Sequence, residues 1–184
     1  CVDGDLNAAL SLLLAGAKVD AENRHGRTPL MAAAMCGHDD VCLALMTRGA
    51  DPNRADTGGE TALHLAIAAF GSAADGNSSG NSSGAGAIAT ICAFRCGDVE
   101  ANAVDADGFT PLLAACWHGD VRAVEALIAS VAPRRLDLDL AATKEGRTAL
   151  HAACWRGHVQ CAAALLDAGA GVDIADADGR TALW

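Results

Sequence analysis

Cysteine and histidine lie close together in the segment LAACWHG, where Cys116 precedes His118 by two residues. A thiol beside an imidazole could form a nucleophile and base, or supply two ligands to zinc. A nucleophile also needs a third group that orients its base, and a structural zinc needs four ligands. No Cys-x-x-Cys occurs, and Cys92 and Cys96 have no pair of histidines nearby. We therefore predict no catalytic residue, no metal and no cofactor, and expect the cysteines to pack as small hydrophobic side chains.

The composition favours a folded helical protein and excludes several classes of partner. The chain has 184 residues and a net charge of -10, and 52% of its residues are hydrophobic while only 3% are aromatic. The excess of acidic residues works against nucleic acid and anionic membrane surfaces, which select for Lys and Arg clusters. No apolar run approaches the roughly 18 residues that a membrane span needs. We expect neither nucleic acid nor a membrane as partner.

The eight cysteines bear on the cellular compartment. Disulfide scaffolds of secreted proteins are short and poor in ordinary core residues, unlike this chain. Two Asn-Ser-Ser sequons, at Asn77 and Asn81, lie in a Gly/Ser-rich stretch where chance supplies them easily. We predict a cytoplasmic protein, with a nuclear location as the alternative.

A five-residue phrase, Gly-x-Thr-(Pro or Ala)-Leu, returns along the chain. Its copies are Gly26–Leu30, Gly59–Leu63, Gly108–Leu112, Gly146–Leu150 and Gly179–Leu183. Their threonines are 33, 49, 38 and 33 residues apart, so two units carry insertions of 16 and 5 residues. The sequence therefore consists of repeated units with a basic period of 33 residues.

Each unit has the pattern of two helices joined by a turn. Thr28 and Pro29 suit the start of a first helix, and Gly37 suits its end. In the second helix the apolar residues recur on one face, namely Val41, Cys42, Leu45 and Met46, and later Val121, Val124, Leu127 and Ile128. A Gly- and Asp-rich turn then leads to the next unit.

The segments Thr61–Ala66, TALHLA, and Thr148–Ala153, TALHAA, resemble ankyrin repeats. The resemblance implies one all-α solenoid of stacked helix-turn-helix units over residues 1–184, with short, extended, β-hairpin-like finger turns. It also implies that His64 and His151 link neighbouring units, and this link is doubtful where the motif histidine is replaced, at Met31, Leu113 and Trp184. The expected units are 23–55, 56–104, 105–142 and 143–175, with partial units at 1–22 and 176–184. Because both ends fall inside a unit, we expect the protein to continue or a partner to cover the ends.

Two insertions interrupt the units. Residues 71–86 are Gly, Ser, Asn and Ala with almost no charge, which predicts a flexible excursion between the two helices of one unit. The second insertion, 130–141, contains Arg134 and Arg135, a local positive spot beside the groove or else a solvated loop. The alternation in Leu136–Leu140 predicts a short extended segment.

Trp117 and Trp155 share one position, just past the small residues of the first helix, where Met35 stands in an earlier unit. The resemblance places that position on the concave groove of the array. Trp and Arg are over-represented among residues whose truncation weakens binding by about 2 kcal/mol or more. The candidate partner-binding residues are Trp117, His118, Trp155, Arg156, Phe109, Arg147, Met35, Arg27, Arg134 and Arg135. The alternative is that each indole packs on an adjacent helix and only staples two units together.

These observations predict a protein–protein interaction module that holds a protein partner in its groove, as a monomer or as part of a longer chain. The alternative is a regulatory or substrate-recruiting domain of a larger enzyme, with the catalytic part outside these residues. We predict that this chain itself is not an enzyme.

Overall fold

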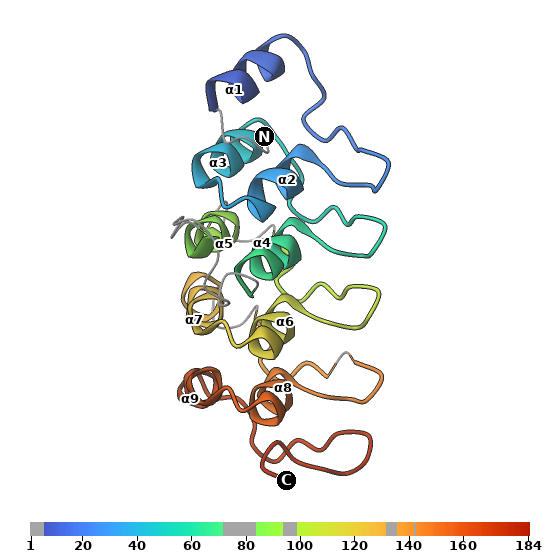
Figure 1. The fold of residues 1–184 in the computed structure, drawn as a ribbon, viewed down its shortest axis with the longest axis vertical. Coiled ribbons are helices and arrows are strands. Elements are labelled where there is room, and N and C mark those ends of the chain that lie inside the picture. Colours follow the sequence, from blue (N-terminus) through green and yellow to red (C-terminus); the bar gives the residue numbers. More distant parts are fainter. Residues whose placement is uncertain (1–5, 72–83, 94–98, 132–135, 142) are drawn as a thin grey trace.

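The computed structural model describes residues 6–71, 84–93, 99–131, 136–141 and 143–184. Nine helices lie in this part of the chain, and their order is α1 Leu6–Leu14, α2 Pro29–Met35, α3 Asp39–Thr47, α4 Ala62–Gly71, α5 Gly84–Ala93, α6 Pro111–His118, α7 Val121–Ser130, α8 Ala149–Arg156 and α9 Val159–Asp167. The even-numbered helices form one column beside the projecting turns, and the odd-numbered helices form a second column (Figure 1). The predicted all-α solenoid is therefore confirmed.

The first helix of a unit starts at its threonine, as predicted. Thr28 precedes α2, and its hydroxyl accepts a hydrogen bond from the Met31 N–H at 3.3 Å. Thr110 caps α6 in the same way, and a proline occupies the first helical position in both. Gly119 ends α6 with φ of 76°, a left-handed conformation that glycine adopts without steric cost.

The core lies between the two columns and runs through the stack as one apolar cluster. The predicted face of α3 is buried, and so are Val124 and Leu127 of α7, while Val121 and Ile128 are partly buried. Each inner unit has its apolar face covered by its neighbours, and removing that face from water contributes about 25 cal/mol per Å² to stability.

The finger turns are held by a carboxylate, amide or hydroxyl oxygen of their first residue. Asp56 Oδ1 accepts hydrogen bonds from the N–H groups of Gly58 at 2.8 Å and Glu60 at 3.1 Å. Successive fingers are joined through their main chains, for example by the Ala106 N–H, which donates to the Gly58 carbonyl at 2.9 Å. Among the described residues the fingers form no strand, only an isolated antiparallel bridge between Ala55 and Thr61.

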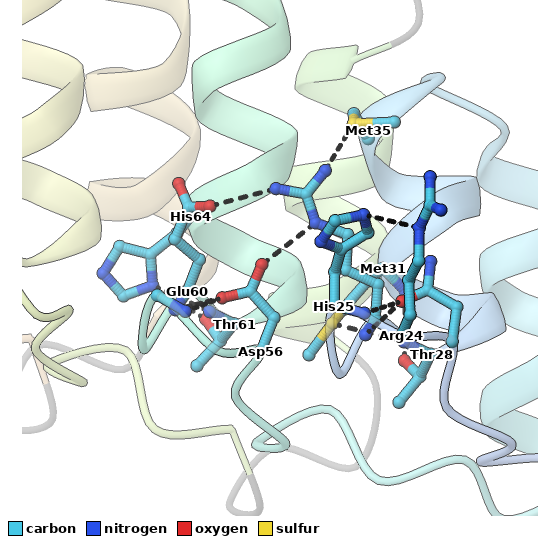
Figure 2. Close-up of polar contacts among 12 residues, drawn as sticks. Arg24, His25, Thr28, Met31, Met35, Asp56, Glu60, Thr61 and His64 are labelled. Atoms are coloured by element: carbon cyan, nitrogen blue, oxygen red, sulfur yellow. Dashed lines mark hydrogen bonds and ion pairs between the residues drawn. The ribbon is translucent and has the colours of Figure 1, made fainter.

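Two buried histidines tie units together, as the resemblance implied. His64 Nδ1 accepts from Thr61 (Figure 2). Its Nε2 meets the Phe109 carbonyl of the next finger at 3.1 Å. His151 makes the same contact with the Arg180 carbonyl at 3.1 Å. Because Nε2 faces an acceptor and Nδ1 faces donors, both rings fit the neutral tautomer with its proton on Nε2.

Two details of the prediction are wrong. Leu136–Leu140 does not form an extended segment, because Asp137 Oδ1 accepts the Asp139 N–H at 3.0 Å and closes a turn. The predicted excursion 71–86 is shorter at both ends, because Gly71 belongs to α4 and Gly84 opens α5. Residues 72–83 lie outside the described residues.

Candidate partner-binding groove

A pocket lies between the finger turns and the first helices of the units that begin near residues 105 and 143. Its volume is about 380 Å³, and it is lined by Asp107, Phe109, Leu113, Trp117, Thr143, Lys144, Glu145, Arg147 and Ala152. Phe109, Trp117 and Arg147 are therefore brought together, as expected of residues on one groove. Within this lining, Leu113, Trp117 and Ala152 come from the helices, whereas Phe109 and all the charged residues come from the fingers.

Trp117 is half-buried and packs against the core. Phe109 meets the indole edge-on, with ring centroids 5.7 Å apart and planes at 88°. From the next unit, Arg156 places its guanidinium carbon 4.8 Å from the centre of the same ring. This side chain thus joins two units, which is the geometry of the stapling alternative.

Trp155 occupies the equivalent position but is 61% exposed. The guanidinium carbon of Arg147 lies 4.0 Å from the centre of its ring, within cation–π range. The cation covers one part of the indole and leaves the rest open to solvent. Trp155 is thus more exposed than Trp117, and the position that corresponds to Arg156 one unit later falls after Trp184, outside the sequence.

The first unit fills the same two positions with Arg27 and Met35, which is 38% exposed. Arg27 Nε donates to Asp56 Oδ2 at 2.9 Å, its Nη2 to Glu60 Oε2 at 3.3 Å, and its Nη1 approaches Met35 Sδ at 3.7 Å (Figure 2). Burial alone would raise the pKa of Asp56, but the hydrogen bonds from Arg27 and from two finger N–H groups outweigh it and lower that pKa. The charge of Arg27 is therefore neutralised within the protein.

A larger cavity, of about 680 Å³, lies at the C-terminal end of the array. Arg147, Trp155 and Arg180 line it together with Leu183 and Trp184. The Arg180 guanidinium carbon lies 4.9 Å from the centre of the Trp184 ring, and Trp184 is 86% exposed. Sequence reasoning left Arg180 and Trp184 out of the candidate set, although Arg180 follows the repeated glycine as Arg27 and Arg147 do.

The remaining candidates are placed as follows. His118 is exposed in the last turn of α6. Arg134 and Arg135 lie outside the described residues, and so does Cys96.

Among the described residues, Cys116 and His118 do not form a reactive pair. Cys116 is fully buried whereas His118 is exposed, so the two side chains do not make a nucleophile and its base. Burial raises the pKa of Cys116 and raises that of Cys42 to about 12, which disfavours the thiolate in both. In the part of the chain that the structure describes, no three His, Cys, Asp or Glu side chains are grouped to hold a metal ion. Nor does any helix there have the length and apolar character needed to cross a bilayer.

Comparisons with known proteins agree with this architecture. Residues 1–75 and 82–178 match the family profile described as ankyrin repeats (3 copies). Inversin from Gallus gallus is 44% identical over 66 residues, which are 35% of this chain and 6% of inversin. The ankyrin repeat and LEM domain-containing protein 1 homolog from Caenorhabditis elegans is 49% identical over 63 residues, 33% of this chain and 9% of that protein.

The matching segments make up less than a tenth of these relatives, so the functions of the whole relatives are not assigned to this chain. The profile match, the stacked two-helix units and the threonine–histidine links all indicate one family. The chain belongs to the ankyrin repeat family.

Proposed function

We propose that this array is a protein–protein interaction module that binds a protein partner along its groove, with Trp155 as the principal anchor. Ankyrin repeats in general mediate interactions between proteins. The observation that carries the proposal is the indole of Trp155 beside the guanidinium of Arg147, at the repeat position that Trp117 and Met35 also occupy. Large aromatic side chains next to Arg are typical of binding hot spots.

The energy available at this position is large enough to matter. A fully buried Trp removes 150–250 Å² from water, so covering the exposed part of Trp155 would remove roughly 120 Å². At about 25 cal/mol per Å² this contributes roughly 3 kcal/mol, or about a hundredfold in affinity.

Trp117 has a different part in the proposal. Its ring is already contacted by Phe109 and Arg156, so a partner gains less area by covering it. We assign it to positioning: it keeps Arg156 and the groove floor in place beside the binding surface.

The same surface would serve a free-standing module or the recruiting domain of a longer protein. The curated relatives extend far beyond their matching segments, which is compatible with the second arrangement. We also propose a cytoplasmic or nuclear location, supported by cysteine thiols that are buried in the core as small apolar groups.

The test is an affinity pull-down from the source cells, which compares the proteins captured by the wild-type chain with those captured by the Trp155→Ala variant. The matched control is Leu43→Ala, which removes an exposed apolar side chain, 46% exposed, from α3 in the other column. Quantitative mass spectrometry should show specific partners lost with Trp155→Ala and retained with Leu43→Ala. If both variants capture the same proteins as the wild type, the groove is not the binding surface.

A further inference from the structure

Each carbonyl that receives a histidine link accepts two hydrogen bonds. The Phe109 carbonyl accepts the Asp105 N–H of its own finger at 3.0 Å and the His64 Nε2–H at 3.1 Å. The Arg180 carbonyl accepts the first N–H of its own finger at 2.8 Å and the His151 Nε2–H at 3.1 Å. Because a carbonyl oxygen has two lone pairs, the imidazole in each case fills the second place on its acceptor.

The third junction, between the third and fourth units, has no such link. Leu113 follows Thr110 by three residues, as His64 follows Thr61. The carbonyl in register with Leu113 is that of Arg147, which comes directly after the repeated glycine of its finger. A leucine side chain has no N–H to donate. The place that an imidazole fills at the neighbouring junctions is therefore open to another donor here.

The pocket of about 380 Å³ lies at this same junction. Leu113 and Arg147 both line it, together with the aromatic rings of Phe109 and Trp117. All its lining residues belong to the third and fourth units, and each of these units packs against further residues of the array on its other side. The pocket is therefore a feature of the interior of the array, and its apolar walls suit a flat ring.

The charged residues around the pocket favour neither sign of ligand. Asp107 and Glu145 carry negative charges, and Lys144 and Arg147 carry positive ones. A ligand with an ammonium or a carboxylate group would meet as many like charges as opposite ones, and their effects would largely cancel. A neutral ring with a hydrogen-bond donor avoids this conflict and still uses both the apolar walls and the carbonyl.

We infer that the pocket at the third junction binds the indole of a tryptophan from the partner, whose N–H donates to the Arg147 carbonyl. This inference rests on the proposed function and gives the partner a second point of attachment beside Trp155. Indole has one donor and no acceptor, and it stays neutral, whereas a histidine of the partner would be partly charged near its pKa. Tryptophan is also the side chain most typical of binding hot spots.

The experiment selects binders from a library of random peptides on the immobilised full chain. We expect the selected peptides to be enriched in tryptophan. Each is then compared with a copy that carries benzothienylalanine, which keeps the shape of the indole but has sulfur in place of the N–H. The loss of this one donor should weaken binding about three- to tenfold in fluorescence anisotropy.

A pair of matched variants locates the donor's acceptor. Leu113→His supplies an internal imidazole at the third junction and should abolish the difference between the two peptides. Met31→His introduces the same residue at the same position of the first unit and should leave the difference unchanged. Thermal unfolding followed by circular dichroism must show that both variants fold. In the wild-type chain, the NMR signals of the Leu113 methyl groups should shift when the tryptophan peptide binds, a result that depends on no variant.

The possible failures are distinguishable. Peptides that depend on Trp155 but bind equally well without the N–H, or keep their N–H preference on Leu113→His, would overturn the indole inference and leave the groove function standing. A selection dominated by Lys and Arg, or by Asp and Glu, in place of tryptophan would also overturn it. Tryptophan peptides that lose their N–H preference on Leu113→His but bind Trp155→Ala at full strength would support the pocket and remove Trp155 as the anchor. If no selected peptide depends on either position, both proposals fail.

Discussion

Gly59 is the residue whose replacement most directly tests how the fingers stack. Its φ of +77° lies in the left-handed region, and an added Cβ would come within 2.9 Å of the backbone nitrogen of Ala106 in the next finger. That nitrogen donates to the Gly58 carbonyl at 2.9 Å, so the clash falls on the hydrogen bond that joins the two fingers. Because the obstacle is backbone, the next finger must move as a whole.

The expected cost of Gly59→Ala has two parts. The left-handed conformation costs a residue with a Cβ about 1–2 kcal/mol. Forcing the neighbouring finger away adds about 1–3 kcal/mol from overpacking and a weakened hydrogen bond. We therefore expect the free energy of unfolding to fall by about 2–5 kcal/mol.

Two further glycines separate these parts. Gly157 has φ of +75° with nothing within 4 Å of its added Cβ, so Gly157→Ala should show only the conformational cost. Gly26 has φ of +72° and a nearest contact of 3.3 Å to the Thr57 nitrogen, so Gly26→Ala should fall between the other two. The measurement is urea denaturation followed by circular dichroism at one temperature, with the slope m checked for each variant.

The order Gly59 > Gly26 > Gly157 is the result that supports the reasoning. Equal losses for Gly59→Ala and Gly157→Ala would show that the fingers give way freely, and that their stacking does not constrain the array.

Three other predictions follow from burial. Burial lowers the pKa of His64 below its usual 6.5, so between these two values the unfolded chain binds a proton that the folded chain does not. The free energy of unfolding should therefore fall as pH decreases from about 6.5 towards the folded-state pKa, by up to about 1.4 kcal/mol per pH unit. In urea titrations, His64→Gln should reduce this dependence on pH. Burial raises the pKa of Cys42 and Cys92 to about 12, so both thiols should resist Ellman's reagent at pH 8 until the protein is denatured; peptide mapping that finds either one labelled in the folded protein would contradict this. Trp117→Ala should lower the unfolding free energy by about 2–3 kcal/mol and Trp155→Ala by less than about 1 kcal/mol, and equal losses in thermal or urea unfolding would mean that both indoles are staples.

Much of the fold is predictable from the sequence because each repeated residue acts locally. Thr28 and Thr110 cap helices through their own hydroxyl groups, and the buried face of α3 follows from spacing alone. The errors arise where contacts with residues far away in the sequence determine the backbone conformation. The alternation in Leu136–Leu140 suggests an extended segment, but Asp139 accepts the Gly171 N–H at 2.8 Å, and this contact between units favours a turn.

The candidate groove is only partly predictable. The shared position of Trp117 and Trp155 follows from the repeat, but their unequal exposure depends on Phe109 and Arg156, which come from different parts of the chain. The change from Glu60 to Arg180 at one finger position is also visible in the sequence.

The imidazole links occur at alternate junctions of the array. His64 and His151 each reach the following finger, whereas Met31 and Leu113 fill the same place at the junctions between them. The two imidazole contacts therefore join the units in twos, the second unit to the third and the fourth to the partial unit that follows it. The junctions without an imidazole are held by other groups: Arg27 pairs with Asp56 and Glu60 across the first, and Arg156 lies on the Trp117 ring across the third. The array thus has more than one kind of joint, so added salt should loosen the first junction and protonation of His64 the second.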